Sequence, residues 1–279
     1  AETAQASNGT SVPKALRRAD FFLKEAFDMR EIAEKLARAM GASKQTVVFT
    51  GAGMSTESGL PDFRSSSGLW GKYRPEDLAS VDALNRNFEN FAAFYRQRIA
   101  TLGEVRPNKG HLILAEWERR GLVSAVITQN VDGLHHAAGS QAVHELHGTL
   151  REVRCRQCGL IRPASTFADE TECKLCGGRM RPAVVLFGEM LPENALSDSA
   201  ALASTCSVFL VLGSSLTVSP ANMLPERAKR HGAALFIINN APTHLDAIAD
   251  GVAQASIGEM LAAVDDLLSG AAEKTTPRN

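Results

Sequence analysis

The chain has no uninterrupted apolar run close to the roughly 20 residues that a membrane-spanning helix needs. It also opens without the apolar segment of a secretory signal, so we expect a soluble, cytoplasmic protein with no membrane partner. An excess of charge of either sign is missing too, because 30 lysines and arginines face 31 aspartates and glutamates. A net charge of −1 argues against direct nucleic-acid binding or attachment to an anionic membrane surface.

Cysteine is scarce, with five residues in 279, and four of the five form two Cys-x-x-Cys pairs. This usage excludes a dense disulfide framework and favours a metal site in a reducing compartment. The fifth, Cys206, lies in an apolar run and is expected to be a small buried side chain. With 44% hydrophobic residues, the chain can bury the core of one large domain and a smaller insert.

A glycine-containing turn after a β-branched run organises the chain. Residues 46–50 read TVVFT and lead directly into Gly51-Ala52-Gly53. A buried strand that ends in such a turn and feeds a helix can hold a phosphate, because unpaired N–H groups face the ligand. The usual dinucleotide fingerprint has a third glycine where Thr56 stands, so this turn departs from that pattern. Glycine also serves plain turns, and the residues alone leave that alternative open.

Strands and helices are predicted to alternate along most of the chain. The predicted helices cover residues 21–40, 87–102, 111–120, 225–231 and 260–268. The predicted buried strands lie at 46–50, 122–128, 143–146, 183–187, 208–212 and 235–238. This alternation predicts an α/β fold with a Rossmann-like, doubly wound parallel sheet. Small or polar residues follow several strands, and they should gather at the carboxyl edge of the sheet, where such sheets bind ligands.

The two cysteine pairs predict a zinc site. Cys155 and Cys158 are separated by 14 residues from Cys173 and Cys176, and two such knuckles complete a tetrahedral site with four thiolates. Four protein ligands leave no position for a substrate, so we expect the zinc ion to be structural. A redox role is one alternative, although it needs only one pair. A nucleic-acid-binding zinc ribbon is another, because of nearby arginines at positions 151, 154, 156, 162, 179 and 181.

Changes in composition along the chain predict its domains. Residues 1–20 are expected to form a disordered tail, and residues 271–279 a second tail. The Rossmann-like domain is expected to combine residues 21–70, 104–150 and 183–270. Two segments interrupt it, a helical part of a small domain at 71–103 and a zinc-binding module at 151–182.

Six longer motifs occur in one order along the chain. They are GAGMSTESGLPDFR, TQNVDGLHHAAG, LHG, the paired Cys-x-x-Cys, VVLFGE and GSSLTVSP. Through them the sequence resembles the sirtuin family of NAD-dependent protein-lysine deacylases over about residues 27–268. The resemblance implies that NAD, as a cosubstrate, and an acyl-lysine protein or peptide meet between the large domain and a small zinc domain.

The same resemblance implies which residues bind NAD. Those expected near the pyrophosphate and nicotinamide ribose are Gly51, Ala52, Ser55, Asp62, Phe63 and Arg64. The motif around the nicotinamide ribose and carboxamide supplies Gln129, Asn130 and Asp132. The adenosine half is matched by Gly213, Ser214, Ser215, Asn239 and Asn240, with Ile257 as a candidate adenine contact.

His147 matches the general base of the family. An imidazole with a pKa near neutrality can take a proton from a ribose hydroxyl at physiological pH. Taken alone, a single histidine is more often a hydrogen-bonded core residue. The resemblance implies that the acyl oxygen attacks C1′ of the nicotinamide ribose, and that His147 then activates a ribose hydroxyl. The products would be free lysine, nicotinamide and O-acyl-ADP-ribose.

Three residues before a glycine match the segment that receives the substrate. By resemblance, Val185, Leu186 and Phe187 would pair with the backbone of the acyl-lysine peptide, a case of strand addition.

The acyl group is suggested by a second pattern. Tyr95 and Arg98 lie three apart, on one face of a predicted helix. With Ala79 sixteen residues before Tyr95, they resemble sirtuins that remove succinyl and malonyl groups, since a guanidinium beside a phenol suits a carboxylate. The plainer alternative is a packed Tyr95 and a solvated Arg98. Asp62 departs from the threonine of several such enzymes, so we expect acetyl-lysine to remain a substrate.

Two other functions stay open at this point. A protein mono-ADP-ribosyltransferase would label protein without any acyl peptide, and a non-catalytic NAD or zinc-ribbon binding module would release no nicotinamide. An ordinary dehydrogenase is disfavoured by the missing third glycine and by the lack of a clear acidic residue after the next strand. The sequence therefore predicts an NAD-dependent deacylase that removes acetyl groups, and also succinyl or malonyl groups, from protein lysines.

Overall fold

The structure is a computed structural model that describes residues 29–65, 68–72 and 74–275. The tail expected at 1–20 and the beginning of the helix expected at 21–40 lie outside these residues. The first described helix occupies residues 29–41 and leads into β1 (Thr46–Thr50). Within the described part of the chain, no helix combines the length and apolar character that crossing a membrane would require.

Six parallel strands form the large sheet, in the order β3-β2-β1-β7-β8-β9. The strands that accompany β1 are β2 (Ala125–Thr128), β3 (Val143–Glu145), β7 (Val208–Leu212), β8 (Ala234–Ile238) and β9 (Gly251–Ala253). Every residue of β1, β2 and β7 is buried, which explains their continuous apolar and β-branched runs. Because the strands are parallel, the segments that follow them meet at one edge of the sheet.

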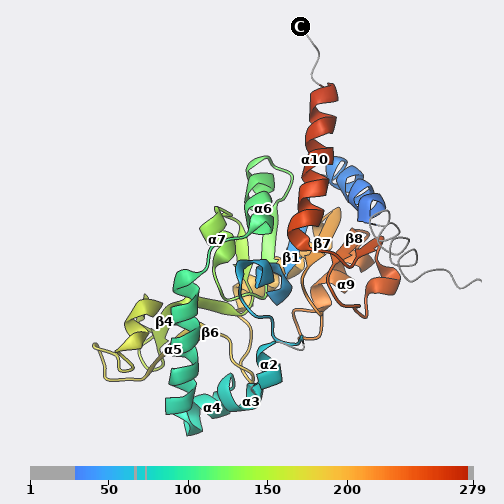
Figure 1. Ribbon diagram of the computed structural model, residues 1–279. Coiled ribbons are helices and arrows are strands. Elements are labelled where there is room, and N and C mark those ends of the chain that lie inside the picture. Colours follow the sequence, from blue (N-terminus) through green and yellow to red (C-terminus); the bar gives the residue numbers. More distant parts are fainter. Residues whose placement is uncertain (1–28, 66–67, 73, 276–279) are drawn as a thin grey trace, which may run out of the picture.

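Helices cover both faces of this sheet (Figure 1). Val48 and Leu210 pack in a core with the helix at 29–41, α6 (Lys109–Arg119) and α10 (Ile257–Thr275). Their neighbours Phe49 and Val211 point to the opposite face, where the core includes α8 (Glu193–Thr205) and α9 (Met223–Arg230). The doubly wound, Rossmann-like α/β fold is therefore confirmed.

A smaller antiparallel sheet, in the order β5-β4-β6, belongs to the insert. Its strands are β4 (Gly148–Cys155), β5 (Ile161–Pro163) and β6 (Met180–Val184). They share a core with α4 (Val81–Arg86), α5 (Phe88–Glu104) and the 3-10 helix η2 (Ala164–Ala168). Two short helices, α2 (Leu69–Lys72) and α3 (Pro75–Leu78), join the glycine loop to this region.

Several boundaries differ from those expected. β6 begins at Met180 and ends at Val184, whereas the sequence predicted a strand at 183–187. Met180 and Arg181 belong to the strand because they pair with β4 in the antiparallel sheet. In residues 185–187, the strand pairing is limited to an isolated bridge between Phe187 and Ser80. The strand β9 was not predicted, because three residues carry no readable periodicity. Helix α10 extends to Thr275, beyond both the predicted helix and the start of the expected tail at 271.

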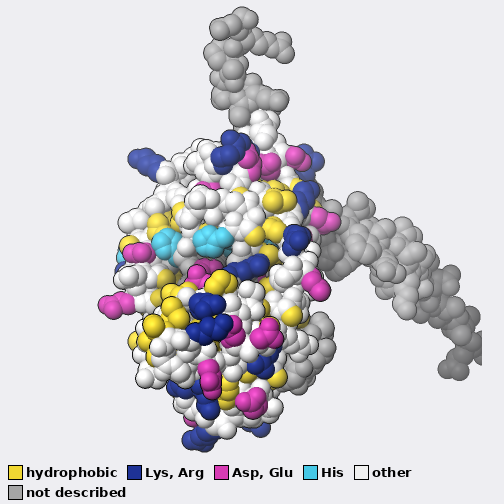
Figure 2. Space-filling model, turned by 90° about the vertical axis from the view of Figure 1, so that its left-hand side faces the viewer, with side chains coloured by type: hydrophobic (Ala, Val, Ile, Leu, Met, Phe, Trp, Pro, Cys, Tyr) yellow, Lys and Arg dark blue, Asp and Glu magenta, His cyan; other side chains and the backbone are white. Residues whose placement is uncertain are grey.

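Basic and acidic side chains are interspersed on the face of the molecule shown in Figure 2. Within the insert, Arg162 lies 3.9 Å from Glu170, and Arg154 lies 4.0 Å from Glu189. Some of the arginines that suggested a zinc ribbon therefore lie beside carboxylates.

Candidate active site and cysteine cluster

The glycine loop is fixed at the carboxyl edge of the large sheet by contacts with the loop after β7. Gly51 N donates to the Leu212 carbonyl at 3.0 Å, and Gly53 N donates to the Gly213 carbonyl at 2.9 Å. A Cβ on Gly53 would lie 2.7 Å from Gly213 Cα, so the two backbones approach too closely for a side chain. The loop continues as a 3-10 helix, η1 (Ala52–Ser58), which ends at Gly59 with φ 89°.

A cavity of about 810 Å³ opens beside this loop and reaches the insert. It brings together most of the residues expected to bind NAD or substrate. Those lining it are Ala52, Asp62, Phe63, Arg64, Ala79, Tyr95, Arg98, Gln129, Asn130, His147, Val185, Leu186, Phe187, Gly213, Ser214, Ser215, Asn239, Asn240 and Ile257. Gly51, Ser55 and Asp132 do not line it, although Ser55 and Asp132 line an adjoining cavity of about 260 Å³.

Hydrogen bonds between buried side chains connect the strand ends behind the two cavities. Ser55 Oγ donates to Asp132 Oδ2 at 2.8 Å, and Asn130 Nδ2 donates to the Gly51 carbonyl at 2.9 Å. Asp132 also accepts from the backbone N–H of Leu134 at 2.8 Å, at the start of α7 (Leu134–Ala138). The expected residues Gly51, Ser55, Asn130 and Asp132 therefore form one network.

His147 stands between β3 and β4 with its imidazole at the cavity wall. Its Nδ1 lies 3.0 Å from the carbonyl oxygen of Gln129. Burial lowers the pKa of His147, and the hydrogen bond to Gln129 opposes that shift only in part. The imidazole is therefore neutral at physiological pH, as a general base must be.

Polar contacts also join the loops whose residues are expected around the adenosine half of NAD. Ser214 Oγ donates to Gln129 Oε1 at 2.9 Å, and Arg64 Nη1 donates to Ser215 Oγ at 3.3 Å. Asp62 Oδ1 accepts from the backbone N–H groups of Arg64 and Ser65, which shapes the loop after the glycine turn.

Tyr95 and Arg98 project from α5 into the same cavity. Tyr95 is 2% exposed and packs against Phe91 with the rings tilted by 48° and 4.6 Å between their centroids. The Arg98 guanidinium carbon lies 5.5 Å from the Phe63 ring centroid and 5.8 Å from that of Tyr95. Burial lowers the pKa of Arg98 and raises the pKa of Tyr95, so at neutral pH the arginine is charged and the phenol is neutral.

The segment after β6 connects His147 to the cavity wall at Ala79. Val185 N donates to the His147 carbonyl at 2.8 Å. Phe187 N donates to the Ala79 carbonyl at 2.9 Å, and Val81 N donates to the Phe187 carbonyl at 3.1 Å. Phe187 itself is 47% exposed at the mouth of the cavity.

The four cysteines of the two knuckles form a cluster outside the cavities, with all Sγ atoms within 4.8 Å of one another. Cys155 Sγ lies 3.5 Å from Cys176 Sγ, and Cys158 Sγ lies 3.6 Å from Cys173 Sγ. Disulfide bonds need about 2.05 Å, whereas four sulfurs around one zinc ion at 2.3 Å lie about 3.8 Å apart. The cluster therefore suits a structural zinc ion with no open coordination position.

Sequence reasoning missed Glu57, which lines the larger cavity. Glu57 Oε1 accepts from Ser256 Oγ at 3.0 Å and from Gly258 N at 3.1 Å, so it ties the glycine loop to the start of α10. It also missed Arg181, which pairs with Glu189. Both contacts join residues that are far apart in sequence or on separate elements, and no local pattern signals them.

Comparisons with known proteins agree with this geometry. Residues 51–220 match the model of the Sir2 family. The NAD-dependent protein deacetylase 1 of Geobacillus kaustophilus is 53% identical over 232 residues, covering 82% of this chain and 96% of that protein. A solved Sir2 homologue with ADP ribose has a TM-score of 0.84 and 38% identity, covering 88% of this chain and 99% of that one. A Sir2 complex with a peptide and NAD+ has a TM-score of 0.78 and 36% identity, covering 85% of this chain and 98% of that one. The chain belongs to the Sir2 family.

Proposed function

We propose that this protein is an NAD-dependent protein-lysine deacylase. It removes acetyl groups from lysine side chains and forms nicotinamide and O-acyl-ADP-ribose. The observation that carries the proposal is one cavity that holds the glycine loop, a neutral His147 and the segment Val185–Phe187 together. The relatives named as NAD-dependent protein deacetylases support the same activity.

His147 is the general base in this proposal. The Gln129 carbonyl can only accept a hydrogen bond, so His147 carries its proton on Nδ1 and presents Nε2 as the basic atom. NAD supplies the ribose carbon that the acyl oxygen attacks as nicotinamide leaves. Nε2 then takes a proton from a ribose hydroxyl, whose oxygen attacks the transferred acyl carbon. The lysine nitrogen leaves that carbon as the free amine, and one water molecule adds to give the acyl ester.

The surrounding residues position the two substrates. The loop at Gly51 would offer backbone close to the NAD pyrophosphate. The loop at Gly213, with Asn239 and Asn240, would hold the adenosine half. Ser55, Asn130 and Asp132 would hold the nicotinamide end near the smaller cavity. The four cysteines would hold a zinc ion that stabilises the insert and takes no part in the chemistry.

We propose further that the enzyme accepts acidic acyl groups, such as succinyl and malonyl, beside acetyl. Arg98 has three aromatic rings around its guanidinium group and no carboxylate partner within salt-bridge distance among the described residues. A half-buried charged group without an anion favours binding of one. Tyr95 lies beside it, and Ala79 leaves space at the same wall. Tyr95 is packed as the plainer alternative requires, but Arg98 is half-buried at the cavity and is not freely solvated.

The deacylase proposal is tested by incubating the wild-type protein with NAD and acetyl-lysine peptide and analysing products by mass spectrometry. Nicotinamide release should require the acyl peptide, and O-acyl-ADP-ribose should accumulate. ADP-ribose attached to protein without acyl peptide would support a mono-ADP-ribosyltransferase instead. No nicotinamide with any acyl peptide would support a non-catalytic binding module.

The acyl preference is tested with Arg98→Met, by comparing kcat/KM for succinyl- and acetyl-lysine peptides. Loss of a charged hydrogen bond worth about 1.5–3 kcal/mol should lower the succinyl value about 10- to 100-fold. The acetyl value should change little. Arg96→Met is the matched control, because Arg96 Nε donates to the Phe167 carbonyl and does not line the cavity. An unchanged ratio in Arg98→Met would contradict the role of Arg98.

A further inference from the structure

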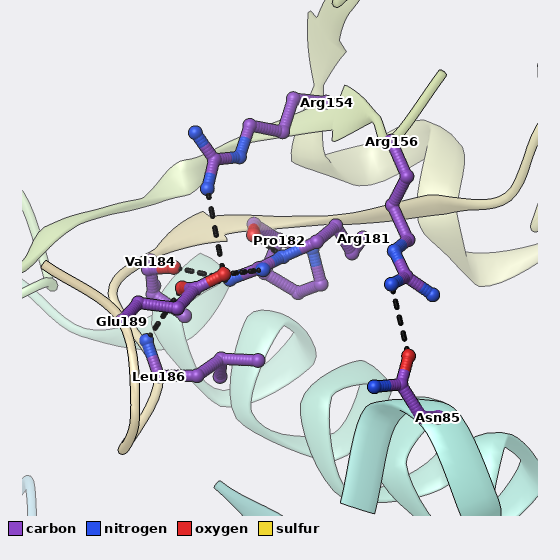
Figure 3. Close-up of polar contacts among 8 residues, drawn as sticks. All are labelled: Asn85, Arg154, Arg156, Arg181, Pro182, Val184, Leu186 and Glu189. Atoms are coloured by element: carbon purple, nitrogen blue, oxygen red, sulfur yellow. Dashed lines mark hydrogen bonds and ion pairs between the residues drawn. The ribbon is translucent and has the colours of Figure 1, made fainter. Parts of the chain in front are cut away.

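An ion pair outside the expected site residues closes the turn that follows β6. Arg181 lies on β6 with its side chain 4% exposed, and Glu189 follows eight residues later with 25% exposed. The guanidinium contacts both carboxylate oxygens, with Nη1 donating to Oε1 and Nη2 to Oε2 at 3.0 Å. Figure 3 shows the guanidinium group of Arg181 pointing toward the carboxylate of Glu189. Such a bidentate pair fixes orientation as well as distance.

The same two side chains hold the backbone between them. Arg181 Nη2 donates to the Val184 carbonyl, and Glu189 Oε2 accepts from Leu186 N at 2.9 Å (Figure 3). Glu189 N donates to the Leu186 carbonyl at 2.9 Å, and Gly188 in the turn has φ 94°. Burial raises the pKa of Glu189, but the hydrogen bonds and charge of Arg181 outweigh it, so the net pKa falls below the usual value. The carboxylate therefore stays ionised and accepts all three donors at neutral pH.

The segment held in this way contacts two parts of the candidate site, one at His147 and one at Ala79. Its Val185 N–H meets the carbonyl of His147, and its Phe187 N–H meets the carbonyl of Ala79. Arg181 does not line the cavity, whereas Glu189 does, so Arg181 can act on the substrate only through Glu189 and this backbone. A displacement of the segment would move the acyl-lysine strand and the wall of the acyl end together.

We propose that Arg181 is a positioning residue whose ion pair with Glu189 holds residues 184–188 in the shape that receives the acyl-lysine peptide. The inference rests on the proposed function, because it concerns the peptide half of that site. It predicts that breaking the pair weakens peptide binding and leaves NAD binding unchanged, since the NAD loops belong to other elements.

The test distinguishes a role in positioning the peptide segment from a role in the stability of the fold alone. Arg181→Met alone leaves the Glu189 carboxylate without its partner and should destabilise the fold. Arg181→Met with Glu189→Leu removes both charges, and an apolar pair of similar volume restores much of the stability. The double variant still lacks the groups that held the Val184 carbonyl and the Leu186 N–H. Its melting temperature should return toward that of wild type, and its peptide affinity should not.

Peptide binding is measured by fluorescence anisotropy with a fluorescein-labelled acetyl-lysine peptide, and NAD binding by calorimetry without peptide. We expect the double variant to bind peptide about 10- to 100-fold more weakly, because the hydrogen bonds of the strand pairing with the peptide would be weakened or lost. Its Kd for NAD should stay within about twofold of wild type, because the loops expected to bind NAD belong to other elements. Arg156→Met is the matched control, because Arg156 bonds Asn85 on α4 at 2.9 Å and makes no contact with Glu189 (Figure 3).

Wild-type peptide affinity in the double variant would overturn the inference, as would an equal loss of NAD affinity. A loss of peptide affinity in Arg156→Met equal to that of the double variant would also overturn it. If the wild-type protein bound no acyl-lysine peptide, the proposed function itself would fail, and this inference with it.

Discussion

His147 Nδ1 lies 3.0 Å from the carbonyl oxygen of Gln129, at the point where the second strand of the sheet gives way to the site loop. The hydrogen bond fixes the tautomer, because a carbonyl oxygen has no proton to give. It also orients the ring, so that Nε2 is the atom available to a substrate at the cavity wall. One backbone carbonyl thereby sets both the tautomer and the direction of the base.

The pH dependence of deacylation follows from this environment. Burial lowers the pKa of His147 from its ordinary value of 6.5, and the neutral form is the active base. The rate should hold at neutral pH and decline only as the pH falls below 6.5. The measurement is kcat/KM for acetyl-lysine peptide from pH 5 to 8. A decline of kcat/KM with its midpoint above pH 6.5 would show that burial does not lower the pKa of His147.

Acid should destabilise the fold through a buried histidine pair. His111 and His135 are 0% and 2% exposed, and their ring centroids are 4.8 Å apart. Burial lowers the pKa of His111 to about 4 and that of His135 to about 3. Below about pH 6.5 the unfolded chain binds protons that the folded chain does not, so stability falls as pH decreases from 6.5 toward 4.

Urea unfolding at pH 7 and pH 5 measures this effect. We expect a loss of roughly 1–2 kcal/mol for each of the two histidines, because each binds close to one proton on unfolding in that range. His231→Gln, at an exposed histidine on the C-terminal end of α9, should leave the loss unchanged. A loss of the same size in His135→Gln as in wild type would contradict the assignment, because Glu145, whose pKa burial raises to about 7, contributes an opposite change to both proteins.

Gly213 is predicted to be intolerant of a side chain. It has φ 61°, and an added Cβ would lie 2.4 Å from Met54 N and 2.5 Å from Gly53 C. Gly213→Ala should therefore push the two NAD loops apart, raise the Kd for NAD and lower the melting temperature. Gly103→Ala is the control, since nothing lies within 4 Å of its added Cβ, and alanine there should be neutral or stabilising. Equal NAD affinity in both variants would contradict a close-packed loop pair.

Removing a cysteine from the cluster should release zinc. Cys158→Ser replaces one of the four sulfurs, and elemental analysis should find about one zinc ion per wild-type chain and much less in the variant. The melting temperature of the variant should fall, because metal binding contributes to folding of such modules. Cys206→Ala, at a buried cysteine outside the cluster, should keep its zinc. A wild-type protein without zinc would contradict the cluster as a metal site.

Local signals in the sequence predicted the parts of the molecule that local chemistry determines. The run at 46–50 and the turn at Gly51 form a central strand and its loop, and the cysteine spacing predicts a cluster that the structure also forms. Gly159 and Gly177 have φ values of 73° and 71° after the second cysteine of each pair. Such features depend on a few neighbouring residues, and periodicity or spacing reveals them.

Features that depend on tertiary contacts could not be predicted in this way. Arg181 belongs to β6 because it pairs with β4 and because Glu189 neutralises its charge. Neither contact leaves a periodic pattern in the sequence. Glu57 reaches Ser256 across 199 residues, and His111 meets His135 between two helices. Except for Gly51, the residues expected around NAD and the acyl-lysine line the two adjoining cavities.

The most direct test of the account is the amount of free lysine and nicotinamide formed in the same reaction by wild type and by His147→Ala. The wild-type protein should form the two products in equal amounts from NAD and acetyl-lysine peptide. The rate at which His147→Ala forms free lysine should be about 10²- to 10⁴-fold lower than in wild type, which is the usual contribution of a general base. Free lysine formed by His147→Ala at the wild-type rate would contradict the central claim.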